Sequence, residues 1–84
     1  MSNFIVYILE CADQTYYVGC TNNLEKRIKE HNTSKNGAHY TKIRRPVVLR
    51  YHEGYETLKE ARGREAAIKK LKREQKAKLF LSSH

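Results

Sequence analysis

FIVYIL at residues 4–9 and YYVGC at residues 16–20 are the two stretches that decide the fold. Both are rich in β-branched and aromatic residues, which favour strands, and the polar residues 12–15 between them favour a turn. Together they predict an antiparallel hairpin whose register stays open. A two-residue turn would place Tyr7 and Tyr17 on opposite faces, whereas an odd-numbered turn or a bulge would place them on one face. We expect the odd turn if the two side chains act together.

The rest of the chain predicts three helices and a third strand. Two capping boxes, each a polar N-cap with a Glu three residues later, open helices over residues 23–32 and 57–71. The polar residues 33–46 are expected to form a loop, residues 47–51 a strand and residues 74–81 a last helix. No Gly or Pro separates the last two helices, so whether they are continuous stays open.

The order β-β-α-β-α-α predicts an α+β fold, a three-stranded antiparallel sheet with three helices packed on it. The chain has 84 residues, which predicts one thin-cored domain over residues 1–84. Its longest apolar run, residues 4–9, is far shorter than the roughly 18–20 residues that a membrane span needs. No secretion signal is evident, and two cysteines suit a reducing compartment, so we expect a cytoplasmic protein without a membrane partner.

The basic residues are unevenly placed along the chain. The formal net charge is +8, and all 17 Lys and Arg residues follow residue 25. A basic excess of this kind favours a polyanion as partner, most often a nucleic acid. The alternative is a solvated surface on a small protein.

Two helices are expected to place ionisable side chains at the border of their apolar stripes. At about 100° per residue, Glu65 falls within the stripe of the helix over 57–71. Arg27 and His31 are four residues apart and border the stripe of the earlier helix. Taken singly, an ion pair explains Glu65, and an aliphatic stem that covers the core explains Arg27. Taken together, they indicate a shared cleft that binds one divalent cation and a phosphate.

These residues also form an ordered pattern along the chain. VYI at residues 6–8 and YVG at residues 17–19 resemble the paired signature of the GIY-YIG nucleases. The segment around Arg27 and His31 resembles the first helix of that family, and the segment around Glu65 resembles the helix that carries its metal-binding Glu. The resemblance covers about residues 3–81 and is closest to the small bacterial members.

The resemblance implies hydrolysis of DNA phosphodiester bonds with one divalent cation, Mg²⁺ or Mn²⁺. It implies that Glu65 is the metal ligand, that Arg27 contacts the scissile phosphate and that His31 assists proton transfer. Tyr7 and Tyr17 would orient and activate the attacking water, one of them as general base. A free Tyr has a pKa of about 10, so such a base needs the cation and an Arg close by.

The same resemblance implies contacts to the DNA backbone that do not read sequence directly. The residues expected to make them are Lys35, Lys42, Arg44, Arg45, Lys69 and Lys70. Gly19 fits a point of close backbone approach. We expect the site to be a shallow surface made by one face of the sheet and two helix edges.

Two features depart from the family's pattern. Both signature triplets are conservative variants, and no Asn follows Asn36, although some members place an Asn beyond the metal-binding Glu. We also expect no second domain, so a protein partner would supply specificity to an enzyme that acts on branched, nicked or single-stranded DNA in repair or recombination. The alternatives are a nucleic-acid-binding module with little or no catalysis, which needs only the basic surface, and a structural or protein-binding domain.

Overall fold

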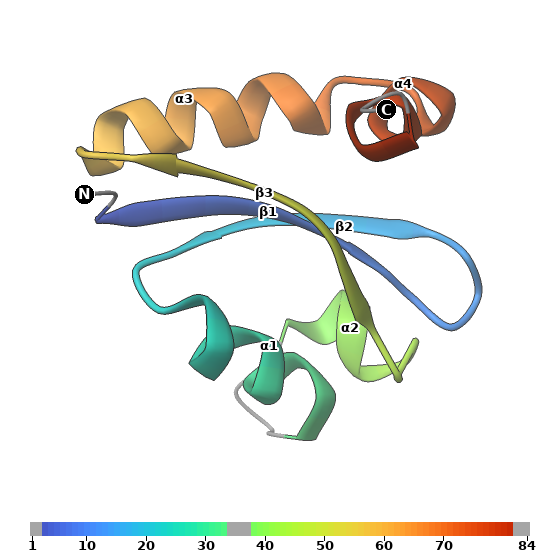
Figure 1. The fold of residues 1–84 in the computed structure, drawn as a ribbon. Coiled ribbons are helices and arrows are strands. Elements are labelled where there is room, and N and C mark those ends of the chain that lie inside the picture. The colour runs from blue at the N-terminus through green and yellow to red at the C-terminus, as the bar shows by residue number, and fades with distance from the viewer. Residues whose placement is uncertain (1–2, 34–37, 82–84) are drawn as a thin grey trace.

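The computed structural model describes residues 3–33 and 38–81 (Figure 1). In chain order its elements are β1 (Phe4–Glu10), β2 (Tyr16–Thr21), α1 (Leu24–Thr33), α2 (His39–Lys42), β3 (Val48–Tyr55), α3 (Leu58–Lys69) and α4 (Arg73–Leu81). The three strands form one antiparallel sheet in the order β2-β1-β3. The predicted α+β fold with a three-stranded antiparallel sheet is confirmed.

The central strand β1 is covered on both faces, which explains its continuous apolar run. α3 and α4 lie on one side of the sheet, and α1 and α2 lie on the other (Figure 1). Val6 and Ile8 pack with Ile68 of α3, and all three are fully buried. Tyr7 and Leu9 belong to a second buried cluster on the other face. The alternation along β1 therefore divides the core into two layers.

The connection between β1 and β2 consists of residues 11–15, so its length is odd. Tyr7 lies opposite Gly19, and Leu9 lies opposite Tyr17. Directly opposed residues project from the same face of an antiparallel pair, so Tyr7 and Tyr17 share one face. This is the arrangement that an odd turn was expected to produce.

The segment predicted as a loop, residues 33–46, is not all loop, because it contains the short helix α2. Thr41 N and Lys42 N both donate to Ala38 O, at 3.1 and 3.0 Å. The prediction missed α2 because a single helical turn carries too few residues for an apolar period.

The third strand is longer than the predicted strand over 47–51, since β3 pairs with β1 as far as Tyr55. Its second half is polar, so pairing with β1 rather than local propensity makes it a strand. Glu53 on β3 accepts two hydrogen bonds from Arg64 of α3, at 2.9 and 3.1 Å. This bidentate pair fixes α3 to the sheet one residue before Glu65.

The last two helices are separate. α3 ends at Lys69 and α4 begins at Arg73. At the start of α4 the side chain of Gln75 accepts a hydrogen bond from Lys72 N at 2.9 Å. A side-chain cap therefore marks the break, without Gly or Pro. Within residues 3–33 and 38–81, no helix has the length and apolar character needed to cross a membrane.

Candidate active site

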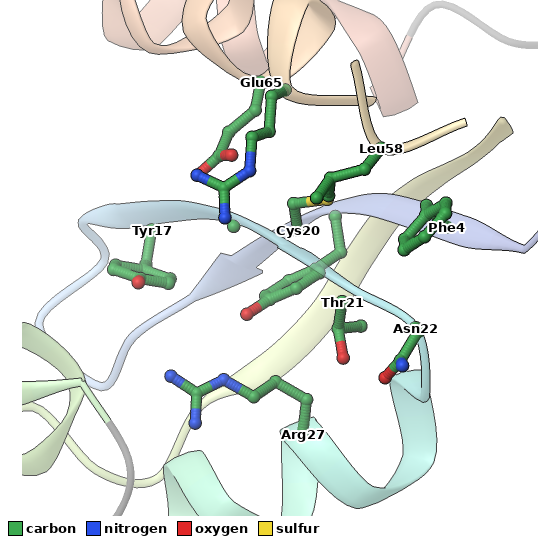
Figure 2. Close-up of a pocket in the computed structure, with 11 residues that line it drawn as sticks. Phe4, Tyr17, Cys20, Thr21, Asn22, Arg27, Leu58 and Glu65 are labelled. Carbon is green, nitrogen blue, oxygen red and sulfur yellow. The ribbon is translucent and has the colours of Figure 1, made fainter. Parts of the chain in front are cut away.

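A cavity of about 460 Å³ opens along the outer edge of β2 (Figure 2). It is lined by Phe4, Tyr7, Tyr17, Gly19, Cys20, Thr21, Asn22, Arg27, Leu58, Arg62 and Glu65. Figure 2 shows Glu65 entering from α3 above β2 and Arg27 entering from α1 below it. The expectation of a site on one face of the sheet is therefore wrong. β2 is an edge strand, and side chains from both faces meet around it.

Tyr7 reaches this edge from the central strand because Gly19 lies opposite it on β2. A Cβ atom at position 19 would lie 2.5 Å from Tyr7 Cζ and 3.1 Å from Tyr17 Cε2. No side chain fits in that space, so the Tyr7 ring lies across the β2 backbone only because residue 19 is a glycine. The group that lies close to the backbone at Gly19 is therefore the Tyr7 ring.

Behind the cavity, three buried side chains form a hydrogen-bonded chain. The Tyr7 hydroxyl lies 2.8 Å from His31 Nε2, and His31 Nδ1 lies 2.8 Å from Thr41 Oγ1. Thr41 Oγ1 donates its single hydrogen to Ala38 O at 2.9 Å, so it accepts from His31 Nδ1–H. Nε2 is then the acceptor of the neutral imidazole, and the Tyr7 hydroxyl donates to it. The network assigns the Nδ1–H tautomer to His31.

Burial sets the protonation states of this pair. The side chains are nearly inaccessible, with Tyr7 1% exposed and His31 0%. Burial, together with the charge of Arg27, lowers the pKa of His31 to about 4, so the imidazole is neutral at pH 7. Burial also raises the pKa of Tyr7, Tyr17 adds to that effect and Arg27 opposes it. At neutral pH a neutral phenol therefore donates to a neutral imidazole.

Arg27 brings a positive charge into the cavity from α1. Its Nη1 donates to Glu30 Oε1 at 3.0 Å, and its side chain is 27% exposed. Burial acts to lower the pKa of Arg27, but hydrogen bonds to Glu30 and Tyr7 raise it above its ordinary value. The guanidinium thus keeps its charge beside the Tyr7 hydroxyl, where it is suited to bind a phosphate.

Glu65 is the single acidic side chain among the residues that line the cavity. It is 18% exposed, and its carboxylate accepts from Lys69 Nζ at 3.0 Å across one helical turn. Lys69 is 54% exposed, so this ion pair is weak and easily exchanged. In residues 3–33 and 38–81, no three His, Cys, Asp or Glu side chains form a metal cage. One accessible carboxylate fits Mg²⁺, which keeps several waters and shares its remaining ligands with substrate phosphates.

Most of the residues expected at the site gather at this cavity. Those that line it are Tyr7, Tyr17, Gly19, Arg27 and Glu65. His31 lies behind them and makes an edge-on contact with Tyr17 at 5.0 Å between ring centroids. It is connected to the cavity through the Tyr7 hydroxyl.

Sequence reasoning missed two residues of this arrangement. Thr41 lies on α2, in the segment expected to be a loop, and nothing in the sequence pattern marks it as a partner of His31. Arg62 lines the cavity and is three residues from Glu65 on the same helix. That spacing places Arg62 and Glu65 on one helical face and was a usable signal.

Two arginines expected to contact DNA are held by the protein itself. Arg45 donates to His31 O at 2.6 Å and to Glu30 O at 3.2 Å, at the C-terminal end of α1. Arg44 donates to Asp13 Oδ2 at 3.0 Å and to Tyr40 O at 3.1 Å. These contacts attach the segment after α2 to α1 and to the β1–β2 turn. A contact of either arginine with DNA stays a prediction.

The four lysines expected to contact DNA lie in different surroundings. Lys70 is exposed at the end of α3, and Lys42 is half-buried at the end of α2. Lys69 is paired with Glu65. Lys35 lies outside the described residues. Their contacts with nucleic acid also stay predictions.

The sequence matches the GIY-YIG catalytic domain over residues 3–78. The chain belongs to the GIY-YIG family. A UPF0213 protein of Syntrophus aciditrophicus is 53% identical over 80 residues, which cover 95% of this chain and 92% of that protein. A UPF0213 protein of Clostridium perfringens is 56% identical over 77 residues, 92% of this chain and 82% of that one. A solution NMR structure from E. faecalis has 41% identity and a TM-score of 0.61, covering 100% of this chain and 95% of that one.

In this GIY-YIG protein the two signature triplets form one structural unit. Tyr7 pairs with Gly19, and Ile8 pairs with Val18, across β1 and β2. The spacing between the triplets therefore sets a cross-strand register, and that register brings Tyr7 and Tyr17 to one face. The chain thus carries the family's catalytic domain, and the residues expected at the site meet in the cavity at the β2 edge. That this cavity is catalytic stays a prediction.

Proposed function

We propose that this GIY-YIG protein is a metal-dependent endonuclease that hydrolyses phosphodiester bonds in DNA. One observation carries the proposal: the Tyr7 hydroxyl donates to the buried, neutral His31 and opens on the cavity that Arg27 and Glu65 also line. These groups supply a proton acceptor, a phosphate contact and a carboxylate for a cation, which are the parts that hydrolysis of a phosphodiester requires.

The proton of the attacking water would leave through Tyr7. His31 is fully buried behind the cavity, so Tyr7 is its connection to the substrate side. As the water proton moves to Tyr7 Oη, the proton of Tyr7 moves to His31 Nε2, 2.8 Å away. A free tyrosinate never accumulates in this sequence, which suits a Tyr7 pKa that burial raises. Tyr7 is therefore the general base, and Tyr17 orients the water.

Arg27 and Thr41 support this transfer in different ways. The guanidinium of Arg27 would bind the scissile phosphate and stabilise the negative charge that grows on it as the water attacks. Its charge also favours the tyrosinate-like character that Tyr7 gains during transfer. Thr41 is a positioning residue, because it accepts from His31 Nδ1–H and keeps Nε2 directed at Tyr7.

Glu65 would hold the cation, Mg²⁺ or Mn²⁺, from the other side of β2. The carboxylate is accessible, and the exposed Lys69 could swing away from it on binding. A bound cation would neutralise charge on the phosphate that Arg27 contacts. Because Glu65 and Arg27 lie on opposite sides of β2, the phosphate would lie between the bound cation and the Arg27 guanidinium.

The proposed substrate is DNA bound through its backbone. A net charge of +8 favours that polyanion, and the exposed Lys70 near the Glu65 end of α3 is suited to track phosphates. We place the activity in structure-selective repair or recombination in the cytoplasm, with a protein partner that adds specificity. Backbone contacts alone would not select a sequence.

A cleavage assay tests the proposal. Linear, single-stranded, flap and junction DNAs are incubated with the wild type in Mg²⁺, in Mn²⁺ or in chelator. Glu65→Gln removes the carboxylate charge at constant shape and should abolish cleavage. Glu56→Gln is the matched control, since Glu56 is exposed, lies outside the residues that line the cavity and contacts Asn3 through its main chain.

If the wild type cuts none of these DNAs with either metal, the proposal is overturned. Retained DNA binding would then favour a nucleic-acid-binding module. If Glu65→Gln cuts as well as the wild type, Glu65 does not hold the cation.

A further inference from the structure

A second hollow, of about 210 Å³, lies on the same edge strand as the active-site cavity. It is lined by Thr15, Tyr16, Tyr40, Arg73 and Lys76. These side chains come from the start of β2, from α2 and from α4, which flank the hairpin end of the sheet in Figure 1. All five are neutral or basic, and two are aromatic. Its size suits a single planar group, below the roughly 300 Å³ at which sites for drug-sized ligands begin.

The Tyr16 ring and the Arg73 guanidinium of this hollow are held in place before anything binds. Arg73 donates from Nε and Nη2 to Gln14 O, at 3.2 and 2.9 Å, and its Cζ lies 5.2 Å from the centroid of the Tyr16 ring. The Tyr16 ring packs edge-on against Phe80, with centroids 5.7 Å apart. Stacking of a ligand here would therefore cost the protein little additional side-chain entropy.

Tyr40, on the α2 side, is fixed in the same way. The guanidinium carbon of Arg44 lies 3.9 Å from the centroid of the Tyr40 ring, and Arg44 is itself anchored to Asp13. Arg44 thus covers one face of the Tyr40 ring, and Tyr40 also lines the hollow. The hollow combines preorganised aromatic rings with two basic side chains, which is the composition that binds unpaired bases and their phosphates.

The hollow is next to the active-site cavity, and the two are linked by a contact between tyrosine rings. Tyr17 lines the active-site cavity, and its ring centroid lies 6.0 Å from that of Tyr40. Tyr16 and Gly19 mark the two sites on β2, three residues and thus roughly 10 Å apart along the strand. That distance is about three times the 3.4 Å rise per nucleotide of a stacked strand in duplex DNA, and an extended single strand spans it with fewer nucleotides. One strand of nucleic acid could therefore occupy both sites.

We propose that this second hollow binds one unpaired base of the substrate strand, within about three nucleotides of the scissile phosphate. The inference rests on the proposed function and makes it more specific. A base inside a duplex presents no free face to an aromatic ring, so a base must be unpaired to stack on Tyr16 or Tyr40. The preferred substrate then has a single-stranded segment beside the cut, as in a flap, a gap or a free single strand.

Binding measured in chelator tests this proposal without any cleavage. Fluorescence anisotropy compares a single-stranded oligonucleotide with a blunt duplex of the same length, both with the Glu65→Gln protein. We expect the single strand to bind at least about 5-fold more tightly, since one stacked base contributes about 1–3 kcal/mol. Tyr40→Leu should remove most of that preference and leave duplex binding nearly unchanged. Tyr55→Leu is the matched control, since Tyr55 is a half-buried tyrosine on β3, outside both sites.

A second measurement needs no substitution in the hollow itself. In NMR spectra of Glu65→Gln, the ring protons of Tyr16 and Tyr40 should shift on addition of the single strand and not of the duplex. Arg73→Gln on α4 should weaken single-strand binding, whereas Lys59→Gln, at an exposed lysine on α3 outside the hollow, should not.

Equal affinity for the two DNAs, or no shift of either tyrosine ring, would overturn the subsite. Tyr16 and Tyr40 shifts in a protein that never cuts DNA would support the subsite and overturn the proposed catalysis. Cleavage of duplex and single strand at equal rates, unaffected by Tyr40→Leu, would support the proposed catalysis and overturn the subsite.

Discussion

The Tyr7 hydroxyl lies 2.8 Å from Nε2 of His31, and both side chains are almost completely buried. The proton acceptor of the proposed reaction is thus inside the protein and is connected to the cavity through one hydroxyl. Burial lowers the pKa of His31 to about 4, so the imidazole is neutral at neutral pH and its Nε2 lone pair accepts from Tyr7. The relay therefore depends on hydrogen-bond geometry as well as on which residues are present.

Tyr7→Phe tests the relay by removing one oxygen atom and keeping the ring. We expect cleavage to fall by at least about 100-fold, the lower end of what general base catalysis contributes. DNA binding in chelator should change little, because Arg27 and the surface lysines remain. Tyr55→Phe is the control, since its hydroxyl donates to Glu53 and lies outside the cavity lining. Full cleavage by Tyr7→Phe would exclude this relay.

Thr41→Val tests whether Thr41 positions His31. The substitution leaves His31 Nδ1–H without its acceptor, which should lower the free energy of unfolding by about 1–3 kcal/mol. It also frees the imidazole to adopt the other tautomer, in which Nε2 no longer accepts from Tyr7. We expect kcat to fall with KM unchanged, and ¹⁵N NMR to show a changed tautomer population at His31.

Thr41→Ser is the conservative variant for the same test, since it keeps the hydroxyl and should restore both kcat and the tautomer. The positioning role fails if Thr41→Val keeps the Nδ1–H form and the wild-type kcat.

The buried His31 should also make stability depend on pH. Burial lowers its pKa from 6.5 to about 4, so between these values the unfolded chain binds a proton that the folded chain does not. The free energy of unfolding should therefore fall as the pH drops from 6.5 through 4, by up to roughly 3 kcal/mol. Denaturant unfolding between about pH 7 and pH 4 measures this change. His31→Gln should lack it, and an equal slope in that variant would assign the effect to other groups.

The sequence predicts the parts of the site that follow from periodicity and register. Arg27 and His31 stood out because they border an apolar stripe, and Glu65 because it falls within one. The odd turn places Tyr7 and Tyr17 on one face. These are local properties, since a helix repeats about every 3.6 residues and a strand every two. The fold class follows from the same local patterns.

What the sequence could not predict depends on contacts between distant segments. Thr41 meets His31 only because a single turn of helix, α2, packs against α1. The placement of Glu65 and Arg27 on opposite sides of β2 requires that β2 be an edge strand, which is a property of the sheet order. Pairing with β1 likewise extended β3 to Tyr55 against its weak local propensity.

Two glycines of this chain offer a matched pair for a last prediction. A Cβ at Gly19 would lie 2.5 Å from Tyr7 Cζ, whereas a Cβ at Gly63 would have no atom within 4 Å. The Tyr7 ring is buried and hydrogen-bonded to His31, so it cannot move aside freely. Gly19→Ala should therefore lower the free energy of unfolding by about 1–3 kcal/mol and displace the Tyr7 hydroxyl from His31.

Gly63 lies inside α3, where alanine is the better helix former, so Gly63→Ala should raise the free energy of unfolding by about 0.5–1 kcal/mol. Denaturant unfolding of both variants, with cleavage measured beside it, gives opposite signs if the Tyr7 ring depends on the space at Gly19. Cleavage should fall in Gly19→Ala even where the protein remains folded, because the relay needs the 2.8 Å contact. A Gly19→Ala protein with wild-type stability and cleavage would show that the ring tolerates a Cβ there and that the signature glycine has another purpose.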